Sequence, residues 1–124
     1  MISKLVKRVR RKKRRKELLY EVIACKENDN TMSPKLAGLL QGMVERLGNN
    51  PSYVRFSYNE DMCAYALMML CRTWHRFNPE YTDNAFAFYA TCIRSSFVQF
   101  IHREKQQRKI KKEYAEYLDC EQHF

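Results

Sequence analysis

The sequence contains little glycine, little proline and no long apolar segment. Three glycines and three prolines among 124 residues are too few for a loop-rich or disordered chain, and they are typical of a helical bundle. No apolar run reaches the ~18 residues that a membrane-spanning helix needs, and the basic start lacks the apolar stretch of a signal peptide. We therefore expect one helical domain in the cytoplasm, without a membrane partner.

Acidic residues are missing from the start of the chain. Residues 1–16 hold ten of the 23 lysines and arginines and none of the 14 acidic residues. Residues 17–124 therefore carry a net charge of −1, and the total of +9 belongs mostly to the first segment. We interpret 1–16 as a basic tail that binds nucleic acid without sequence preference. The alternatives are that this tail binds an acidic protein surface or a nuclear-import receptor.

The cysteines do not form a pattern that indicates disulfides or a metal site. They are five in number and mostly in apolar helical contexts: Cys25, Cys63, Cys71, Cys92 and Cys120. This indicates reduced, mostly buried thiols of a cytosolic protein. Cys120 and His123 have zinc-ligand spacing, but no second pair accompanies them. We predict no metal, no cofactor and no enzymatic activity, because paired carboxylates, an activated nucleophile and a cofactor loop are not recognisable.

Apolar residues recur at helical spacing in four segments, which predicts an all-α bundle of about four helices. The first helix includes part of the basic run and ends near Cys25. The second spans 34–48, with Ser33 as N-cap and Gly48 at its end. Residues 49–56 are expected to form a loop.

The last two predicted helices are joined by a break at Asn78-Pro79. The third helix spans 57–77, where Ser57 and Glu60 have capping-box spacing. The fourth is long, is capped by Asp83 or Asn84, and reaches about Leu118. These elements divide the chain into the basic tail 1–16, a helical domain 17–112 and a C-terminal tail 113–124.

One side of the predicted fourth helix carries polar and basic residues at spacings of one, three and four: Arg94, Ser95, Gln99, His102 and Arg103. Such a row is suited to entering a DNA groove and contacting base edges and phosphates. The alternative is a solvated face on a helix that serves the core.

Two adjacent segments resemble a known family. DMCAYALMMLCRTWHRF at 61–77, followed by FAFYATCIR at 86–94, resembles region 2 of bacterial sigma factors. A still closer likeness is to the late-transcription sigma factors of T-even-type phages, through Phe97-Val-Gln99, Ile101 and the basic run after them. The resemblance implies a promoter-specificity subunit with a helical region 2 domain.

By this resemblance, the third helix would dock on the clamp coiled coil of the largest subunit of RNA polymerase. The matching positions are Asp61, Ala64, Tyr65 and Met68. Bacterial sigma factors have polar groups at the second and third of these positions. A more apolar docking face is still plausible, because interface cores favour methionine and aromatic residues. For Met68, filling of the core is the alternative.

The resemblance also implies that the fourth helix opens and recognises a −10-type promoter element. Phe88 and Tyr89 would point outward and stack on unpaired bases, while Phe86, Ile93, Phe97 and Phe100 would point inward. Ser95 and Gln99 match the positions that face base edges. The phosphate contacts would come from Arg94, Arg103, Lys105, Arg108 and Lys109. Cys92 and Ile93 stand where housekeeping sigma factors have a tryptophan pair.

After Lys112 too few residues remain for a second DNA-binding module. Late phage sigma factors also lack it, and they depend on a co-activator and on the replication sliding clamp, which they contact through an apolar C-terminal tail. The resemblance implies that Tyr117, Leu118 and Phe124 anchor the tail to the clamp. The alternative is that these residues form only a frayed helix end. Two other functions stay open: a helical adaptor or inhibitor that binds polymerase without contacting DNA, and a general nucleic-acid-binding protein.

Overall fold

The computed structural model describes the backbone of residues 2–122 and the side chains of 3–121. Within this range the chain is all-α, as predicted, with no strand. Its elements are α1 (Ile2–Glu27), α2 (Pro34–Gly48), α3 (Pro51–Val54), α4 (Asn59–Thr73), the 3-10 turn η1 (Trp74–Arg76) and α5 (Ala85–Gln122). The four long helices were predicted, whereas α3 lies in a segment that was expected to be a loop.

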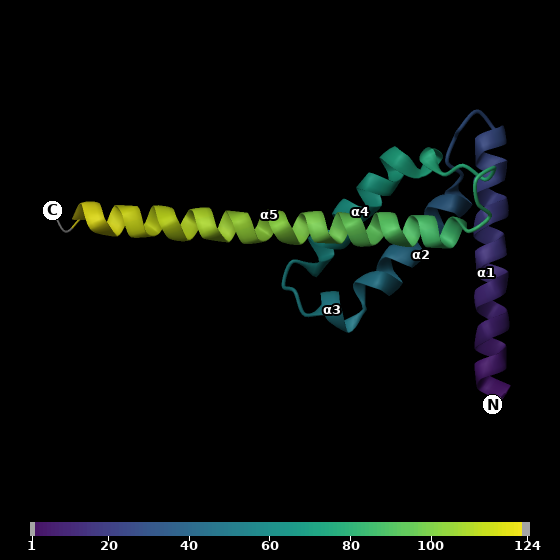
Figure 1. Cartoon of the computed structure of the whole chain (residues 1–124), viewed down its shortest axis with the longest axis horizontal. Coiled ribbons are helices and arrows are strands. Elements are labelled where there is room, and N and C mark those ends of the chain that lie inside the picture. Colours follow the sequence, from purple (N-terminus) through teal and green to yellow (C-terminus); the bar gives the residue numbers. More distant parts are fainter. Residues whose placement is uncertain (1, 123–124) are drawn as a thin grey trace.

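The helices pack around the first half of α5 (Figure 1). α2 and α4 lie against this half, and α1 crosses its N-terminal end (Figure 1). The second half of α5 and the first half of α1 project away from the bundle (Figure 1). Almost all side chains of the two projecting arms are exposed, and many of them are charged.

The first sixteen residues were predicted to be a tail with only a part of it helical. In the structure α1 is continuous from Ile2 to Glu27. Its last turns pack into the core through Leu18, Val22 and Cys25, all of them buried. The basic run is therefore the N-terminal extension of a packed helix.

Local capping explains where α2 begins, and packing explains its last residue. The Ser33 hydroxyl accepts a hydrogen bond from the Leu36 amide at 3.1 Å, and Pro34 is the first helical residue. Gly48 ends the helix, as predicted, but without a left-handed conformation. A Cβ at Gly48 would lie 2.5 Å from the Cys63 sulfur, so α4 approaches too closely for a larger residue.

The predicted capping box of α4 is wrong. The N-cap is Tyr58, and no side chain caps the helix. Asn59 instead donates to the carbonyls of Gly48 and Tyr53, at 3.0 and 3.1 Å. The start of α4 is therefore determined by tertiary contacts with the end of α2 and with α3.

The core joins all four long helices. Its largest fully buried side chains include Met62 of α4, Phe77 after η1, and Tyr89, Ile93 and Phe97 of α5. Lys26 links α1 to the segment after α4, because its ammonium group donates to the carbonyls of His75 and Phe77 at 2.9 and 2.6 Å. No helix within residues 2–122 is both long and apolar enough to cross a membrane.

Candidate nucleic-acid interface

The predicted row on α5 is exposed to solvent. Five side chains are exposed, whereas the neighbouring Ile93, Ser96 and Phe97 are buried: Arg94, Ser95, Gln99, His102 and Arg103. Arg94 is on the side of α5 next to α1 and α2, and Gln99 and Arg103 are on the side next to α4. The phosphate contacts predicted farther along, Lys105, Arg108 and Lys109, lie on the arm that projects beyond the bundle. The structure thus presents these residues along one rigid helix.

Tyr89 is not available at the surface, contrary to the prediction that it points outward. Its side chain is 0% exposed, and its hydroxyl donates to the Trp74 carbonyl at 2.8 Å. Burial raises the pKa of the Tyr89 phenol well above its usual range. The reason is helical spacing: positions 89, 93 and 97 are four residues apart and share one side. A ring on the same buried side of α5 as Ile93 and Phe97 therefore cannot also stack on an unpaired base.

Phe88 is half-buried, so it is only partly accessible for the stacking role. Its ring lies 5.4 Å from that of Phe77 and 5.3 Å from that of Tyr89, between ring centres. Among the aromatics that were predicted to point inward, Phe86 and Phe100 are also only half-buried. Phe88 lies in the first turn of α5, so its exposed part is close in sequence to the loop that precedes the helix.

The sequence interpretation missed Tyr81. This residue lies in the turn between η1 and α5 and is 89% exposed, the highest value among the exposed large apolar and aromatic side chains. Polar side chains shape the turn, since the Asn78 amide oxygen accepts from the Glu80 amide at 2.9 Å. An exposed ring in a turn offers a flat surface for an unpaired base.

Gln99 contacts the helix that was predicted to bind polymerase. The Tyr65 hydroxyl donates to the Gln99 amide oxygen at 3.0 Å, and the Arg103 guanidinium lies 5.1 Å from the Tyr65 ring centre. Bidentate bonding to adenine needs both the amide oxygen and the amide nitrogen. The oxygen has a second lone pair, and the nitrogen is not used by the bond to Tyr65.

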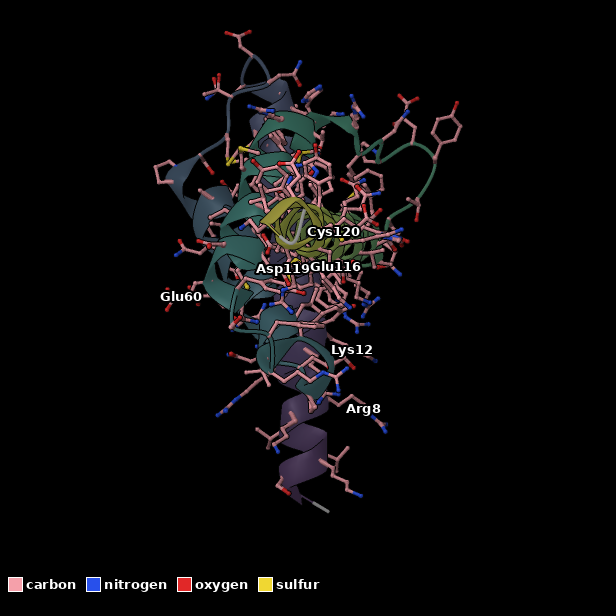
Figure 2. All side chains as sticks on the ribbon, turned by 90° about the vertical axis from the view of Figure 1, so that its left-hand side faces the viewer. Arg8, Lys12, Glu60, Glu116, Asp119 and Cys120 are labelled. Carbon is pink, nitrogen blue, oxygen red and sulfur yellow. The ribbon has the colours of Figure 1, made fainter. Side chains whose placement is uncertain are left out.

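The predicted polymerase-binding residues lie on the outer side of α4. Asp61, Ala64 and Met68 are exposed, with Met68 at 41%, and Tyr65 is half-buried against Phe100. They recur at three- and four-residue spacing, so they form one stripe next to the α5 row. Glu60 lies at the start of the same helix (Figure 2).

The C-terminal segment is helical through Gln122. Tyr117 and Leu118 are exposed on its outer part, and Phe124 lies outside the described residues. The Tyr117 hydroxyl donates to Glu121 at 2.7 Å, and this bond raises the pKa of the phenol. Figure 2 looks along α5 from this end and shows Glu116, Asp119 and Cys120 on the projecting arm.

The cysteines are free thiols, but fewer are buried than predicted. Cys25 is buried, Cys63 and Cys92 are half-buried, and Cys71 and Cys120 are exposed. Burial raises the pKa of the Cys63 and Cys92 thiols, so both are protonated at neutral pH. No group of three or more metal-binding side chains occurs in the described part of the chain.

Comparison with known protein families, with characterised proteins and with solved structures finds no match for this chain.

Proposed function

We propose that this protein is a promoter-specificity subunit, which docks on RNA polymerase through α4 and contacts promoter DNA through α5. One observation carries the proposal: Gln99 and Arg103 of the exposed row on α5 contact Tyr65 in the stripe of α4, so the two surfaces adjoin. Two surfaces on adjacent helices suit a protein that joins DNA to a second macromolecule. The resemblance of 61–94 to sigma region 2 supports the same assignment.

The geometry changes which ring would hold an unpaired base. Tyr89 is buried, so we assign this role to Tyr81 and the exposed part of Phe88. Ser95 and Gln99 retain the base-contact role. Arg94, Arg103, Lys105, Arg108 and Lys109 retain the phosphate role, because they are exposed along α5. The sliding clamp and a co-activator remain proposed partners of the outer part of α5, through Tyr117 and Leu118.

The test begins with DNA binding and a matched pair of variants. Gln99→Glu keeps an acceptor for the Tyr65 hydroxyl and removes the amide donor for adenine. It should therefore change the preferred base at one position by about 5- to 150-fold in relative affinity, the equivalent of ~1–3 kcal/mol. Lys109→Ala should weaken all sequences alike and reduce the salt dependence. The measurement is a titration of duplexes that differ at single base pairs.

Run-off transcription then tests the complete function. Core RNA polymerase with this protein is offered an A·T-rich promoter on a linear template and on a template whose −10 region is already unpaired. Promoter-specific initiation on at least one template is expected, and Tyr81→Ala should impair the linear template more than the pre-melted one. Initiation on neither template would refute the proposal.

The adaptor function is favoured by one observation, the hydrogen bond from Tyr65 to the Gln99 amide oxygen. If this bond only braces α4 against α5, the Gln99 variants will leave base preference unchanged. Changes at Asp61 or Met68 would then abolish polymerase binding without any effect on DNA. That pair of results would identify a polymerase-binding adaptor or inhibitor.

A further inference from the structure

A groove lined by arginine lies between α1, α2 and α5. Its volume is about 840 Å³, and the arginines that line it are Arg11, Arg14, Arg15, Arg46 and Arg94. No acidic residue lines the groove, and neither ion pair found among the described residues involves any of these arginines. Five guanidinium groups around one opening repel one another, so a bound polyanion would be stabilised there.

Within residues 11–16, the three arginines line the groove and the three lysines do not. These lysines are Lys12, Lys13 and Lys16, and all three are exposed. Lys12 projects outward from the helix (Figure 2). A guanidinium group binds phosphate through two parallel hydrogen bonds, which an ammonium group cannot do. This difference favours phosphate as the ligand of the groove.

Two of the three glycines in the chain keep the groove open. Gly38 and Gly42 line it from the interior of α2, where glycine is unfavourable for a helix. A Cβ at Gly38 would meet no atom within 4 Å, and one at Gly42 would meet only the Arg46 side chain, at 3.3 Å. Helix packing therefore does not require either glycine. Because both residues lack a side chain, they leave free space in the groove.

Apolar side chains complete the lining. Leu39, Leu47 and Phe86 are half-buried and expose part of their surface to the groove. The Arg15 guanidinium lies over Phe86 at 4.7 Å from the ring centre. A ligand that matches this lining carries both phosphates and flat apolar faces. Duplex DNA hides its base faces in the stack, whereas a single strand exposes them.

We propose that this groove binds the backbone of single-stranded nucleic acid, with its phosphates on the five arginines and one or more bases against Leu39, Leu47 and Phe86. The inference deepens the proposed function, on which it rests for the expectation that the chain handles strand-separated DNA. It adds a contact surface on α1 and α2, which shares Arg94 with the phosphate contacts predicted on α5.

The probe is fluorescein-labelled oligothymidylate of about 12 nucleotides, a length within the range that single-strand-binding domains cover. Gly38→Leu should fill the groove without changing the charge, and it replaces a poor helix former by a good one. Its affinity for the probe should fall by about tenfold or more. Gly38→Ala is the matched control, because its methyl group leaves the groove open.

A second pair of variants separates the groove from the general charge of α1. Replacing Arg11, Arg14 and Arg15 by glutamine should weaken binding by at least about tenfold and lower the salt slope by about 2, since each phosphate contact contributes ~0.7. Replacing Lys12, Lys13 and Lys16 by glutamine removes the same charge and should have a clearly smaller effect. Thermal unfolding and far-ultraviolet circular dichroism verify that every variant is folded.

Competitors identify the ligand. Comparing unlabelled oligouridylate with unlabelled oligothymidylate as competitors for the labelled probe shows whether RNA or DNA is preferred. A hairpin duplex should displace the probe poorly. Competition by polyglutamate as effective as that by oligothymidylate would overturn the nucleic-acid assignment. So would equal binding by Gly38→Leu and Gly38→Ala, or by the arginine and lysine variants. The two proposals can fail separately. If the groove tests fail while Gln99→Glu still alters base preference, the proposed function stands without the groove. If the groove tests succeed while run-off transcription fails, the groove stands without the promoter role.

Discussion

Tyr89 shows how one side chain links function and stability at the scale of the residue. Its ring packs against those of Phe77 and Phe88, and its hydroxyl donates to the Trp74 carbonyl in the turn after α4. The residue therefore holds η1 against α5, just before the loop that carries Tyr81. Its contribution is structural, and the exposed ring in the loop is the better candidate for contact with a base.

The Tyr89→Phe variant should reveal this role through pH. At about pH 8 it should lower the free energy of unfolding by ~0.5–1.5 kcal/mol, the value of one neutral hydrogen bond. The folded-state pKa of Tyr89 is raised, so its contribution is intact below the ordinary tyrosine pKa of ~10 and is lost as the pH rises above it. Wild-type stability should therefore fall faster than that of the variant above about pH 10. Urea unfolding across this range tests the prediction, and parallel curves would contradict it.

At the scale of the element, α5 depends on a side-chain cap at its start. The Asn84 amide oxygen accepts from the Ala87 amide at 3.0 Å, and the Thr82 hydroxyl accepts from the Asn84 amide at 3.1 Å. The sequence predicted Asp83 or Asn84 as the cap, and the structure assigns Asn84. The cap determines where the rigid helix begins, and therefore which residues of the row face outward.

Asn84→Ala should lower the free energy of unfolding by about 1 kcal/mol, because the amide of Ala87 loses its partner. Asp83→Ala is the matched control, since Asp83 is exposed, and it should change stability by less than ~0.5 kcal/mol. Chemical unfolding of the two variants under the same conditions gives the comparison. Equal losses would mean that capping does not determine the start of α5.

At the scale of the whole molecule, polar contacts attach α1 to the rest of the bundle. Besides the two hydrogen bonds of Lys26, the Ser33 hydroxyl donates to Glu21 at 2.6 Å and Lys35 pairs with Glu17 at 3.2 Å. The last pair is largely exposed and contributes little. The bonds from Lys26 matter more, because they join residues about fifty positions apart and satisfy two carbonyls.

Lys26→Met keeps the apolar stem and removes the charged donor. We expect a loss of about 1–3 kcal/mol in the free energy of unfolding, because the carbonyls of His75 and Phe77 lose this partner. Lys16→Met on the exposed part of α1 should cost less than ~0.5 kcal/mol. Guanidinium unfolding followed by the fluorescence of Trp74 measures both, and a harmless Lys26→Met would show that α1 is held by apolar packing alone.

The sequence by itself was sufficient for the helices and for several of their ends. Apolar periodicity identified α2, α4 and α5, and Ser33 and Asn84 marked two starts, because caps and stripes depend on residues only three or four positions apart. The same periodicity would have predicted that Tyr89 is buried, because Tyr89 lies four and eight residues before Ile93 and Phe97. Local spacing also indicated that Ser95 and Gln99 share one side of α5, which the structure leaves exposed.

Only the tertiary structure decided the features that need residues distant in the chain. The close approach of Cys63 requires glycine at position 48. The hydrogen bonds of Asn59 determine where α4 begins. The packing of α4 against α5 brings Gln99 to Tyr65. The groove brings together three arginines of α1 with Arg46 and Arg94, which no local pattern connects. Such contacts arise when whole helices pack together, and periodicity within one helix carries no information about which other helix will lie against it.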